Sequence, residues 1–476
     1  MGPYSRPASP FLALALLAAL QAPAPAAPNP GAAAAPVARA APRAVLDLAR
    51  WFPGGISPGL VWAVDAVPGG DARAGTVARA GAAIRYTAPA AAGAHLVSAA
   101  PAAGGAPVAW AAVLVGAVPD PPPGPAANVK EPPYLARGDA GGDDTYAIQR
   151  ALDAVAGTGG TVLIPAGTYR INTVANANRG LVIGGSLTLR LAPGATLKAI
   201  PSASASSTIL SVAGAADVAI QGGTLLGDRS AHPGAAGEWG MGLAIQGSRR
   251  VTVSGVTARD CWGDGFYVAG SGDVTFDAVL ADHNRRNGLS VISCRTLTVR
   301  GSVFRNSQGT DPQDGLDIEP NSGDSVTGVL ITGCLFADNA GNGLEDGVPD
   351  SNSGRAFITQ VTVDGNASAG NGRGPAPSGD RVGIRISNCP GTLVTGNVVM
   401  ANARMGIYLR NNADGSLVQG NTAAFNAGDG IAQASCRDNR IIANRVVGNA
   451  GHGISSSHCG GGTVSANTLA GNAMGP

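Results

Sequence analysis

The sequence predicts an all-β chain in which a small β-sandwich precedes a long solenoid of stacked strands. Nine segments begin with a glycine followed by an aliphatic or aromatic residue, from Gly242-Leu243 to Gly453-Ile454. The steps between these glycines are 23, 23, 27, 28, 40, 23, 24 and 23 residues. A repeat in the low twenties is typical of coils stacked along one axis. Glycine, at 71 of 476 residues, suits the tight turns between short strands better than long helices.

The first 30 residues predict a secretory signal peptide. Arg6 supplies a positive charge, and residues 11–20 form an apolar core that is too short to span a membrane. No other apolar run reaches spanning length, so we expect a secreted or periplasmic protein without a membrane span. The Ala/Pro-rich segment 31–42 is predicted to be disordered. A formal net charge of +1 gives no indication of a nucleic-acid partner and does not bear on the oligomeric state.

Residues 43–118 predict the β-sandwich. Four short apolar runs alternate with glycine and proline, namely Leu60–Val64, Ile84–Thr87, His95–Ala99 and Ala109–Val115. The sequence from Val61-Trp62-Ala63-Val64 to Tyr86-Thr87-Ala88-Pro89 resembles the Ig-like modules that are appended to bacterial surface and secreted proteins. The resemblance implies a spacer or attachment role. Residues 119–136 predict a proline-rich, extended linker.

Residues 137–476 make up the predicted solenoid domain. Asp143-Asp144-Thr145 predicts the start of a helix that continues to Val155, and a strand and turn follow from Gly159 to Tyr169. This stretch resembles the capping helix and first strand of the pectate-lyase-like superfamily, whose members are right-handed parallel β-helices. The resemblance implies that fold, with the helix closing one end of the solenoid. It does not imply one activity, because the fold is shared by lyases, glycosidases, epimerases and phage tailspikes.

Aligning the coils by their glycines predicts which side chains share one outward column. Side chains alternate along a strand, so Asp317 and Glu319 face outward while Leu316 and Ile318 face inward. The column two residues after each glycine reads Ala244, Tyr267, Ser290, Asp317, Glu345, Arg385, Tyr408, Ala432 and Ser455. Insertions near residues 307–313, 346–355 and 372–382 enlarge the same coils that carry the charges. Since insertions in a solenoid often build its binding face, we expect an exposed functional patch there.

The spacing of the acidic residues suits glycosidic-bond chemistry. The Cα atoms of Asp317 and Glu319 should lie roughly 6.5–7 Å apart along the strand, and those of Asp317 and Glu345 about 5 Å apart across coils. Like charges this close leave a protonated acid beside an ionised base, which is the requirement for hydrolysis with inversion or retention. We therefore assign Asp317, Glu319 and Glu345 as acid/base groups and Arg385 as a clamp on the substrate. The candidate substrate-binding residues are Asp314, Tyr267, Tyr408, Arg410, Trp262 and His283.

Other functions remain open from the sequence. A lyase acting by β-elimination on a uronic-acid polymer would hold calcium on Asp314, Asp317 and Glu345, with Glu319 and Asp346 as further ligands and Arg385 as the base. A hydrolase would need no cofactor. An epimerase is the third possibility, since Asp317-Ile318-Glu319-Pro320 stands where alginate epimerases carry Asp-Pro-His-Glu, but the histidine is replaced. A carbohydrate-binding solenoid without catalysis is the fourth. Each implies a polysaccharide partner, and the arginines favour an acidic one.

Three further patterns predict structural roles. Cys436 and Cys459 fall on neighbouring coils, where either a disulfide or a stack of reduced thiols fits. Asparagines recur at steps of 23 and 24 residues and predict ladders of hydrogen bonds along the axis. His452 holds the turn position that Asp264, Asn287, Asp314 and Asp429 occupy in other coils, so we expect a structural role for it, and Asp264 has the same alternative.

Overall fold

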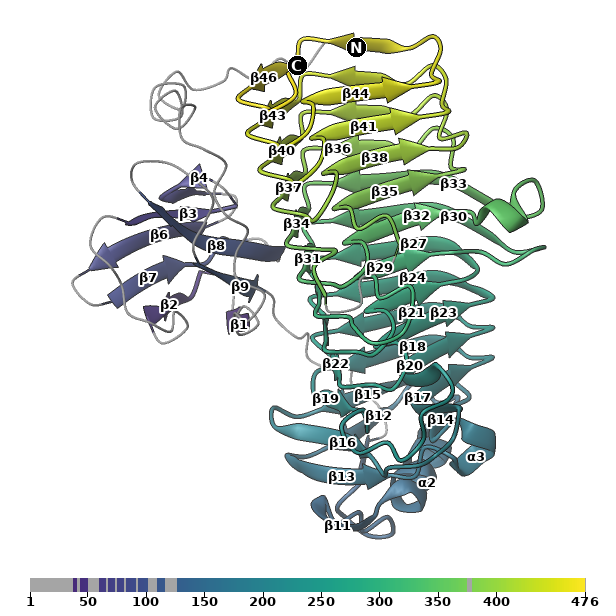
Figure 1. Ribbon diagram of the computed structural model, residues 1–476. Helices are drawn as coiled ribbons and strands as arrows, with labels where there is room; N and C mark the ends of the chain where they lie inside the picture. The colour runs from purple at the N-terminus through teal and green to yellow at the C-terminus, as the bar shows by residue number, and fades with distance from the viewer. Residues whose placement is uncertain are drawn as a thin grey trace.

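The computed structural model is an all-β protein, as predicted. It describes residues 37–40, 43–49, 60–65, 67–72, 75–80, 83–90, 93–101, 109–115, 126–374 and 379–475, so the predicted signal peptide lies outside the described residues. The larger part is a right-handed parallel β-helix of three long parallel sheets, two with 13 strands and one with 11 (Figure 1). No helix in the described ranges is long and apolar enough to cross a membrane.

The N-terminal part consists of two small sheets that share one apolar core. Their strands are β1 (Val37–Ala40), β2 (Val45–Asp47), β3 (Leu60–Val64), β4 (Val67–Pro68), β5 (Gly70–Asp71), β6 (Gly75–Ala80), β7 (Ala83–Thr87), β8 (Gly93–Pro101) and β9 (Ala109–Val115). The order is β1-β9-β8-β3-β4 in one sheet and β2-β7-β6-β5 in the other. Val97 from the first sheet and Tyr86 from the second are both fully buried in this core. The Ig-like resemblance stays a prediction, and β1 forms a strand within the segment predicted to be disordered.

The solenoid begins earlier than the sequence predicts. Strand β10 (Ala126–Asn128) lies within the expected linker and pairs with β12 (Thr161–Ile164). Helix α2 (Thr145–Val155) is the predicted cap, and Ile148 and Leu152 on its apolar face are buried in the solenoid core. Figure 1 shows α2 and the short α3 (Ala175–Asn178) at one end of the stack. The helix therefore covers the apolar interior that an open coil would expose to water.

The 11-stranded sheet carries the predicted column of side chains. One 13-stranded sheet runs from β10 to β45 (Thr463–Ser465), and the other from β11 (Asp139–Asp143) to β46 (Thr468–Ala470). The 11-stranded sheet consists, in order, of β14 (Leu181–Ile183), β17 (Ser206–Ala213), β20 (Trp239–Gln246), β23 (Phe266–Ala269), β26 (Leu289–Val291), β29 (Leu316–Ile318), β32 (Leu344–Gly347), β35 (Ile384–Ser387), β38 (Ile407–Arg410), β41 (Ile431–Ala434) and β44 (Ile454–Ser457).

Two asparagine ladders stabilise the turns of the C-terminal coils, as predicted. In each ladder the side-chain Nδ2 donates to the Oδ1 of the asparagine one coil on, at 2.9–3.0 Å. The ladders consist of Asn339, Asn371, Asn402, Asn426, Asn449 and Asn472, and of Asn366, Asn397, Asn421, Asn444 and Asn467. They satisfy polar groups that the turns would otherwise bury without a partner. Cys436 and Cys459 are free thiols.

Asp346 faces the solenoid interior, which corrects its assignment as a possible calcium ligand. Its register partners are Ile318 and Ile386, both fully buried. Cys389 and Thr392 donate to its carboxylate at 3.4 and 3.3 Å. Burial raises the pKa of Asp346 to about 7, and these two donors offset only part of that rise. The alternation that turns Glu345 outward turns its neighbour inward.

We expect Asp346→Asn to stabilise the protein at alkaline pH. The pKa of Asp346 is higher in the folded protein than in the unfolded chain. Below the unfolded pKa, Asp346 causes no loss of stability. As the pH rises through the folded-state pKa of about 7, the folded protein loses stability. Asparagine removes that loss, and each kcal/mol recovered raises the melting temperature by about 2–4 °C. Thermal unfolding at about pH 5 and about pH 8 checks this. Equal destabilisation by Asp346→Asn at both pH values would show that the carboxyl is not the titrating group.

Candidate functional site

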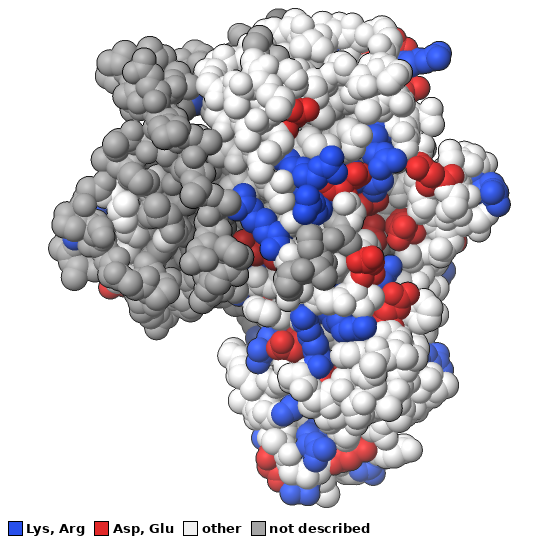
Figure 2. Space-filling view, in the orientation of Figure 1, with Lys and Arg blue, Asp and Glu red and all other residues white. Residues whose placement is uncertain are grey.

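The strand register places the predicted side chains in one column. Asp317 on β29 pairs with Ser290 on one side and with Glu345 of β32 on the other. Glu345 pairs with Arg385 of β35, and Arg385 with Tyr408 of β38. Figure 2 shows charged side chains gathered over the middle of this face, whereas the C-terminal coils above are largely uncharged. The repeat in the sequence therefore located the charged patch correctly.

The expectation that this patch is exposed was wrong for its central residue. Asp317 retains only 2% of its accessible surface, although it faces away from the interior side chains Leu316 and Ile318. Glu319 follows β29, is half-buried, and donates its backbone N–H to the Val291 carbonyl at 3.0 Å. The acids are thus packed among neighbouring side chains. That burial decides their protonation.

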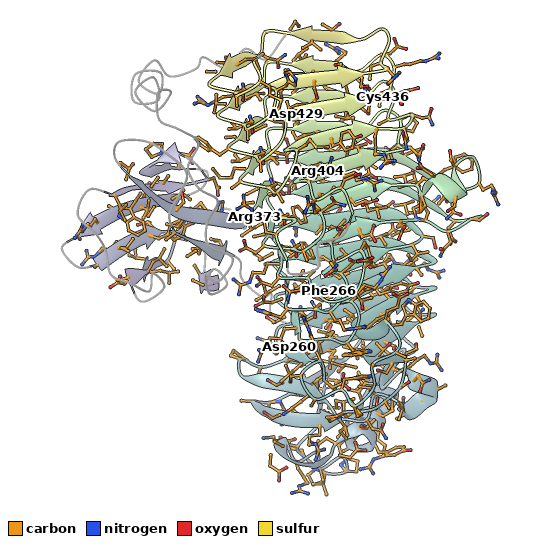
Figure 3. All side chains as sticks on the ribbon, in the orientation of Figure 1. Asp260, Phe266, Arg373, Arg404, Asp429 and Cys436 are labelled. Atoms are coloured by element: carbon orange, nitrogen blue, oxygen red, sulfur yellow. The ribbon has the colours of Figure 1, made fainter. Side chains whose placement is uncertain are left out.

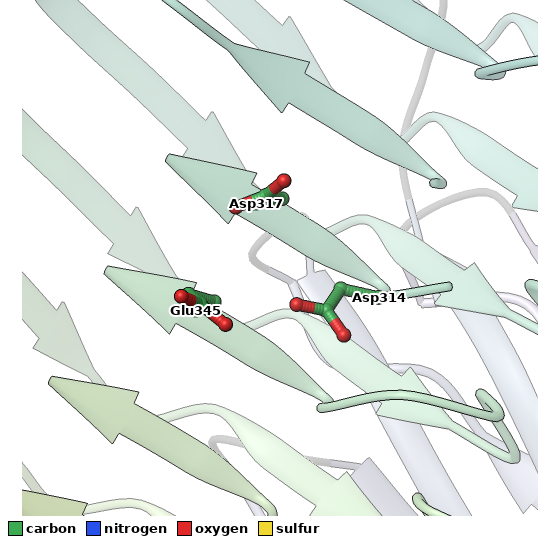
Figure 4. Close-up of side chains that lie close together, drawn as sticks. All are labelled: Asp314, Asp317 and Glu345. Carbon is green, nitrogen blue, oxygen red and sulfur yellow. The ribbon is translucent and has the colours of Figure 1, made fainter. Parts of the chain in front are cut away.

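Three carboxylates converge at the centre of the patch. The side chains of Asp314, Asp317 and Glu345 each place an oxygen within 4.8 Å of the other two. Figure 4 shows Asp317 and Glu345 on adjacent strands, with Asp314 on the segment that leads into β29. Asn342 donates to Asp314 Oδ2 at 3.3 Å and to Glu345 Oε2 at 2.9 Å. Asn287 donates to Asp317 Oδ2 at 3.0 Å, so two asparagines orient the three acids.

Asp314 also has a structural role in the turn before β29. Its Oδ1 accepts the backbone N–H of Asn342 at 2.5 Å, and its own N–H donates to Asn287 Oδ1 at 2.8 Å. Asp429, labelled in Figure 3, repeats this contact at a later coil by accepting the His452 N–H at 2.7 Å. A Cβ at Gly341 would overlap Asp314 Oδ1, so only glycine allows the close approach there. Asp314 therefore belongs to both the turn and the acidic cluster.

Burial raises the pKa values of the clustered acids. It raises the pKa of Asp314 to about 7, against the opposing donors of Asn342. The pKa of Asp317 rises well above its usual range because of burial first and the nearby Glu319 and Asp314 second. Burial also raises the pKa of Glu319, against the two nearest arginines. At neutral pH this group therefore holds protons that isolated carboxylates would release.

Arg385, predicted as a clamp on the substrate, and Arg410, predicted as a substrate-binding residue, are both paired with acids of the chain. Arg385 Nη1 contacts Glu345 Oε1, and Arg385 Nε lies 2.7 Å from Asp380 Oδ2. Arg410 lies 3.1 Å from Asp380 and 3.4 Å from Asp350. Asp350 and Asp380 come from the insertions 346–355 and 372–382, and η3 (Asp350–Asn352) lies in the first of these. Arg385 and Arg410 thus connect the insertions 346–355 and 372–382 to the 11-stranded sheet through ion pairs.

Arg286 and Glu238 border the acids on the N-terminal side and were not predicted from the sequence. Arg286 Nη1 donates to both oxygens of Asp264, at 3.3 and 3.4 Å, and to Ser290 Oγ at 3.1 Å. Glu238 ends an insertion, residues 227–238, between β19 (Thr224–Leu226) and β20, and its Oε2 lies 3.9 Å from Arg286 Nε. The insertion precedes the first aligned glycine, so the coil steps could not reveal it.

The remaining predicted residues lie around the cluster rather than in it. Tyr267 and Tyr408 are half-buried in the same column, and burial raises the pKa of both. The Trp262 ring is stacked on His232, with centroids 3.9 Å apart, and the Arg285 guanidinium lies 4.0 Å from it. His283 pairs instead with Asp282, at 2.8 Å. No contact brings Trp262 or His283 to the three acids within the described part of the chain.

The three acids also satisfy the basic requirement for a cation site. Hard cations such as Ca²⁺ take carboxylate oxygens, and Asp314, Asp317 and Glu345 offer one each within reach of a shared ion. Over the residues described, no other group of three His, Cys, Asp or Glu side chains lies close enough to share one. The group of Asp314, Asp317 and Glu345 contains no thiolate or imidazole, which are the donors that copper prefers.

Three family models match different parts of the solenoid. "Rhamnogalacturonase A/epimerase, pectate lyase-like" matches residues 126–208. "Right handed beta helix region" matches residues 236–367, and "Periplasmic copper-binding protein (NosD)" matches residues 313–476. The second and third of these overlap on the acidic cluster. Each covers less than half of the chain, so together they support the fold rather than one activity.

Two curated relatives and one solved structure are similar to parts of the chain. The chain is 28% identical to uncharacterized protein YclG of Bacillus subtilis over 37% of this chain and 35% of that protein. It is 25% identical to the SPbeta prophage-derived uncharacterized protein YorA of Bacillus subtilis over 47% of this chain and 46% of that one. The chain thus spans about a third to a half of the curated relatives it matches. The Dettilon tailspike protein superposes with a TM-score of 0.55 at 15% identity, over 72% of this chain and 68% of the tailspike. The chain belongs to the right-handed parallel β-helix superfamily that includes the pectate-lyase-like proteins.

Proposed function

We propose that this protein is an exported carbohydrate-active enzyme that hydrolyses glycosidic bonds of a polysaccharide. The observation that carries the proposal is the contrast between Asp317 and Glu345, which neighbour each other on the outer face. Asp317 is buried with a raised pKa, whereas Glu345 is paired with Arg385. Arg385 favours the ionised form of Glu345. The site thus offers a proton donor beside a carboxylate, as glycosidic hydrolysis requires.

The proposed roles follow from these protonation states. Asp317 donates its proton to the leaving oxygen of the glycosidic bond, and Glu345 acts at the anomeric carbon from the adjacent strand. Their nearest oxygens lie within 4.8 Å of each other. That spacing is closer to the ~5–5.5 Å of retaining enzymes than to the ~6.5–9.5 Å that leaves room for a water. The geometry therefore favours retention, with Glu319 as a further acid beside Asp317.

The comparisons support the substrate class and the location of the proposed enzyme. Two of the matching family descriptions name pectate-lyase-like and periplasmic proteins, and the tailspike supports the same architecture. An exported protein agrees with the apolar segment at residues 11–20 of the sequence. Arg286, Arg385 and Arg410 around the cluster favour an acidic polymer.

A second candidate, cation-assisted β-elimination on a uronic-acid polymer, is favoured by the convergence of Asp314, Asp317 and Glu345. When bound there, a calcium ion would acidify the proton next to the uronate carboxyl. Arg385 lies beside Glu345 and is the candidate base, because burial and Arg410 lower its pKa. The two candidates make the same prediction for binding and different predictions for products.

The distinguishing experiment is digestion of a glycan panel by the full chain, with and without a chelator. Hydrolysis predicts new reducing ends, no ultraviolet absorbance from unsaturated uronides, and no effect of the chelator. Cation-assisted elimination predicts that absorbance and its loss in chelator. Binding without any product would favour the non-catalytic solenoid and contradict both enzymatic proposals.

The hydrolase should work best at acidic to neutral pH. The proton on Asp317 is required, and the raised pKa values of Asp317 and Asp314 mean that these protons are present at low pH and are lost as the pH rises. Ionised Asp314 raises the pKa of Asp317 further, so we expect kcat to hold through neutral pH and to fall at higher pH, where Asp317 itself loses its proton. A pH–rate profile on the cleaved polymer measures the fall. Activity that rises steadily into the alkaline range would contradict the assignment of Asp317 as the acid.

A further inference from the structure

Cys436 and Cys459 lie side by side on adjacent coils, far from the acidic cluster in the sequence. Strands β41 and β44 pair in parallel, and Arg437 pairs with Gly460 in the same register just beyond them. The Gly460 N–H donates to the Cys436 carbonyl at 3.2 Å, so the pairing continues through the cysteines. Neighbouring positions of such a ladder hold their Cα atoms about 4.8 Å apart. That separation lies within the roughly 4.4–6.8 Å that a disulfide spans.

Both thiols have the same orientation. Cys436 is 1% exposed and belongs to the apolar interior of the solenoid, and Cys459 is partly buried and packs against that interior. Each thiol donates to the carbonyl two residues before it, at 3.2 Å for Cys436 and 3.3 Å for Cys459. The two side chains therefore lie one above the other, and neither Cβ points away from its neighbour.

The six cysteines differ in their access to solvent. Cys261, Cys294, Cys334 and Cys389 are each no more than 3% exposed. Cys459 is the only one of the six that is not buried, and all six lie in the described part of the chain. Burial raises the pKa of Cys436 to about 11, with Cys459 as a further contributor, so Cys436 is rarely a thiolate at neutral pH. A dissolved oxidant should therefore meet Cys459 first.

The chain around Cys459 can adjust to a covalent bond. Three glycines follow it, residues 460–462, and a Cβ at Gly460 would meet no atom within 4 Å. The same coil is held by little burial, since all three residues of β45 are exposed and Val464 retains 52% of its accessible surface. A segment with few buried apolar contacts opens more readily than a packed one. A bond from Cys459 to the buried Cys436 would thus stabilise a coil to which packing contributes little.

We infer that Cys436 and Cys459 are an oxidisable pair that forms a disulfide outside the cytoplasm and links the coil of β44 to that of β41. The inference rests on export to an oxidising compartment and is independent of the proposed hydrolysis. A small or protein disulfide is the oxidant. The Cys459 thiolate attacks one of its sulfurs, which forms a mixed disulfide and releases one thiol. The Cys436 thiolate then attacks the Cys459 sulfur and releases the second thiol, so two electrons and two protons pass to the oxidant.

The test incubates the folded full chain with oxidised glutathione, blocks the remaining thiols with iodoacetamide, and maps the peptides by mass spectrometry without reduction. We expect a product lighter by two hydrogen atoms in which the peptides of Cys436 and Cys459 are joined. Hydrogen exchange at the amides of β44 and β45 should slow by about tenfold or more in the oxidised protein. Dithiothreitol should reverse both changes.

Three variants, each checked for folding by thermal unfolding, separate the two roles. Cys436→Ala keeps the accessible thiol and should retain glutathione as a mixed disulfide, whereas Cys459→Ser keeps only the buried thiol and should stay unmodified. Cys294→Ala is the matched control, because it removes a buried cysteine whose ladder partners are Ser271 and Val326, and it should form the link as the wild type does.

Two results would overturn the inference. One is a wild type in which Cys436 and Cys459 both stay reduced in oxidised glutathione, and the other is a bond from Cys459 to a different cysteine. The measurement does not depend on any polysaccharide. Failure of the proposed hydrolysis would therefore leave the disulfide result unchanged, and failure to form the disulfide would leave the proposed hydrolysis unchanged.

Discussion

Replacement of Asp317 by asparagine is expected to lower kcat on the cleaved polymer by about 10²–10⁴-fold, with a smaller change in KM. Asparagine has nearly the same shape and can still accept the hydrogen bond from Asn287, but it cannot donate the proton that burial keeps on Asp317. Because the substrate contacts remain, the loss should appear in the chemical step. Steady-state kinetics on the polymer identified by the glycan panel provide the measurement.

The Asp317→Asn variant should fold at least as well as the wild type. A buried acid with a raised pKa destabilises the folded state as the pH rises, and the amide removes that effect. Asp217→Asn, on an exposed acid paired with Arg250 in a 13-stranded sheet, is the matched control and should retain full activity. Wild-type rates in Asp317→Asn, with folding confirmed by thermal unfolding, would show that the acid lies elsewhere.

Replacement of Arg385 by methionine is expected to destabilise the protein by about 3–5 kcal/mol. Methionine fills similar space but leaves Glu345 without its cation and Asp380 with Arg410 alone. Arg385 is largely buried, with 16% of its side chain exposed, so water cannot compensate for the loss. Activity should fall as well, because Glu345 would no longer be held as a carboxylate. Denaturant unfolding and kcat measured in parallel check both effects.

A double variant separates the lost ion pair from a packing defect. Glu345→Gln combined with Arg385→Met removes both charges and should recover part of the stability lost by Arg385→Met alone. The coupling between the two sites follows from a double-mutant cycle. Strictly additive losses would mean that Arg385 and Glu345 do not stabilise each other, and the proposed ionised carboxylate would lose its support.

The parts of this site that repeat along the solenoid could be predicted from the sequence. The glycine spacing alone puts Asp317 beside Glu345 and Glu345 beside Arg385, because each coil copies the register of the one before. The same alternation should have placed Asp346 inside, since it directly follows an outward residue.

The parts built by insertions could not be predicted. The partners of the arginines, Asp350 and Asp380, lie in loops that break the repeat, so no register relates them to Arg385 or Arg410. The burial of Asp317 depends on side chains packed around it rather than on its strand. Arg286 and Glu238 meet across a turn and an insertion, which sequence spacing does not bring together.

The most direct test of the central claim is cleavage of the identified polymer by the wild type in heavy-oxygen water, with mass spectrometry of the products. Hydrolysis by Asp317 and Glu345 predicts one heavy oxygen in each new reducing end, and almost none formed by Asp317→Asn. Unsaturated products without heavy oxygen, or the same labelled products at the same rate from Asp317→Asn, would contradict the account.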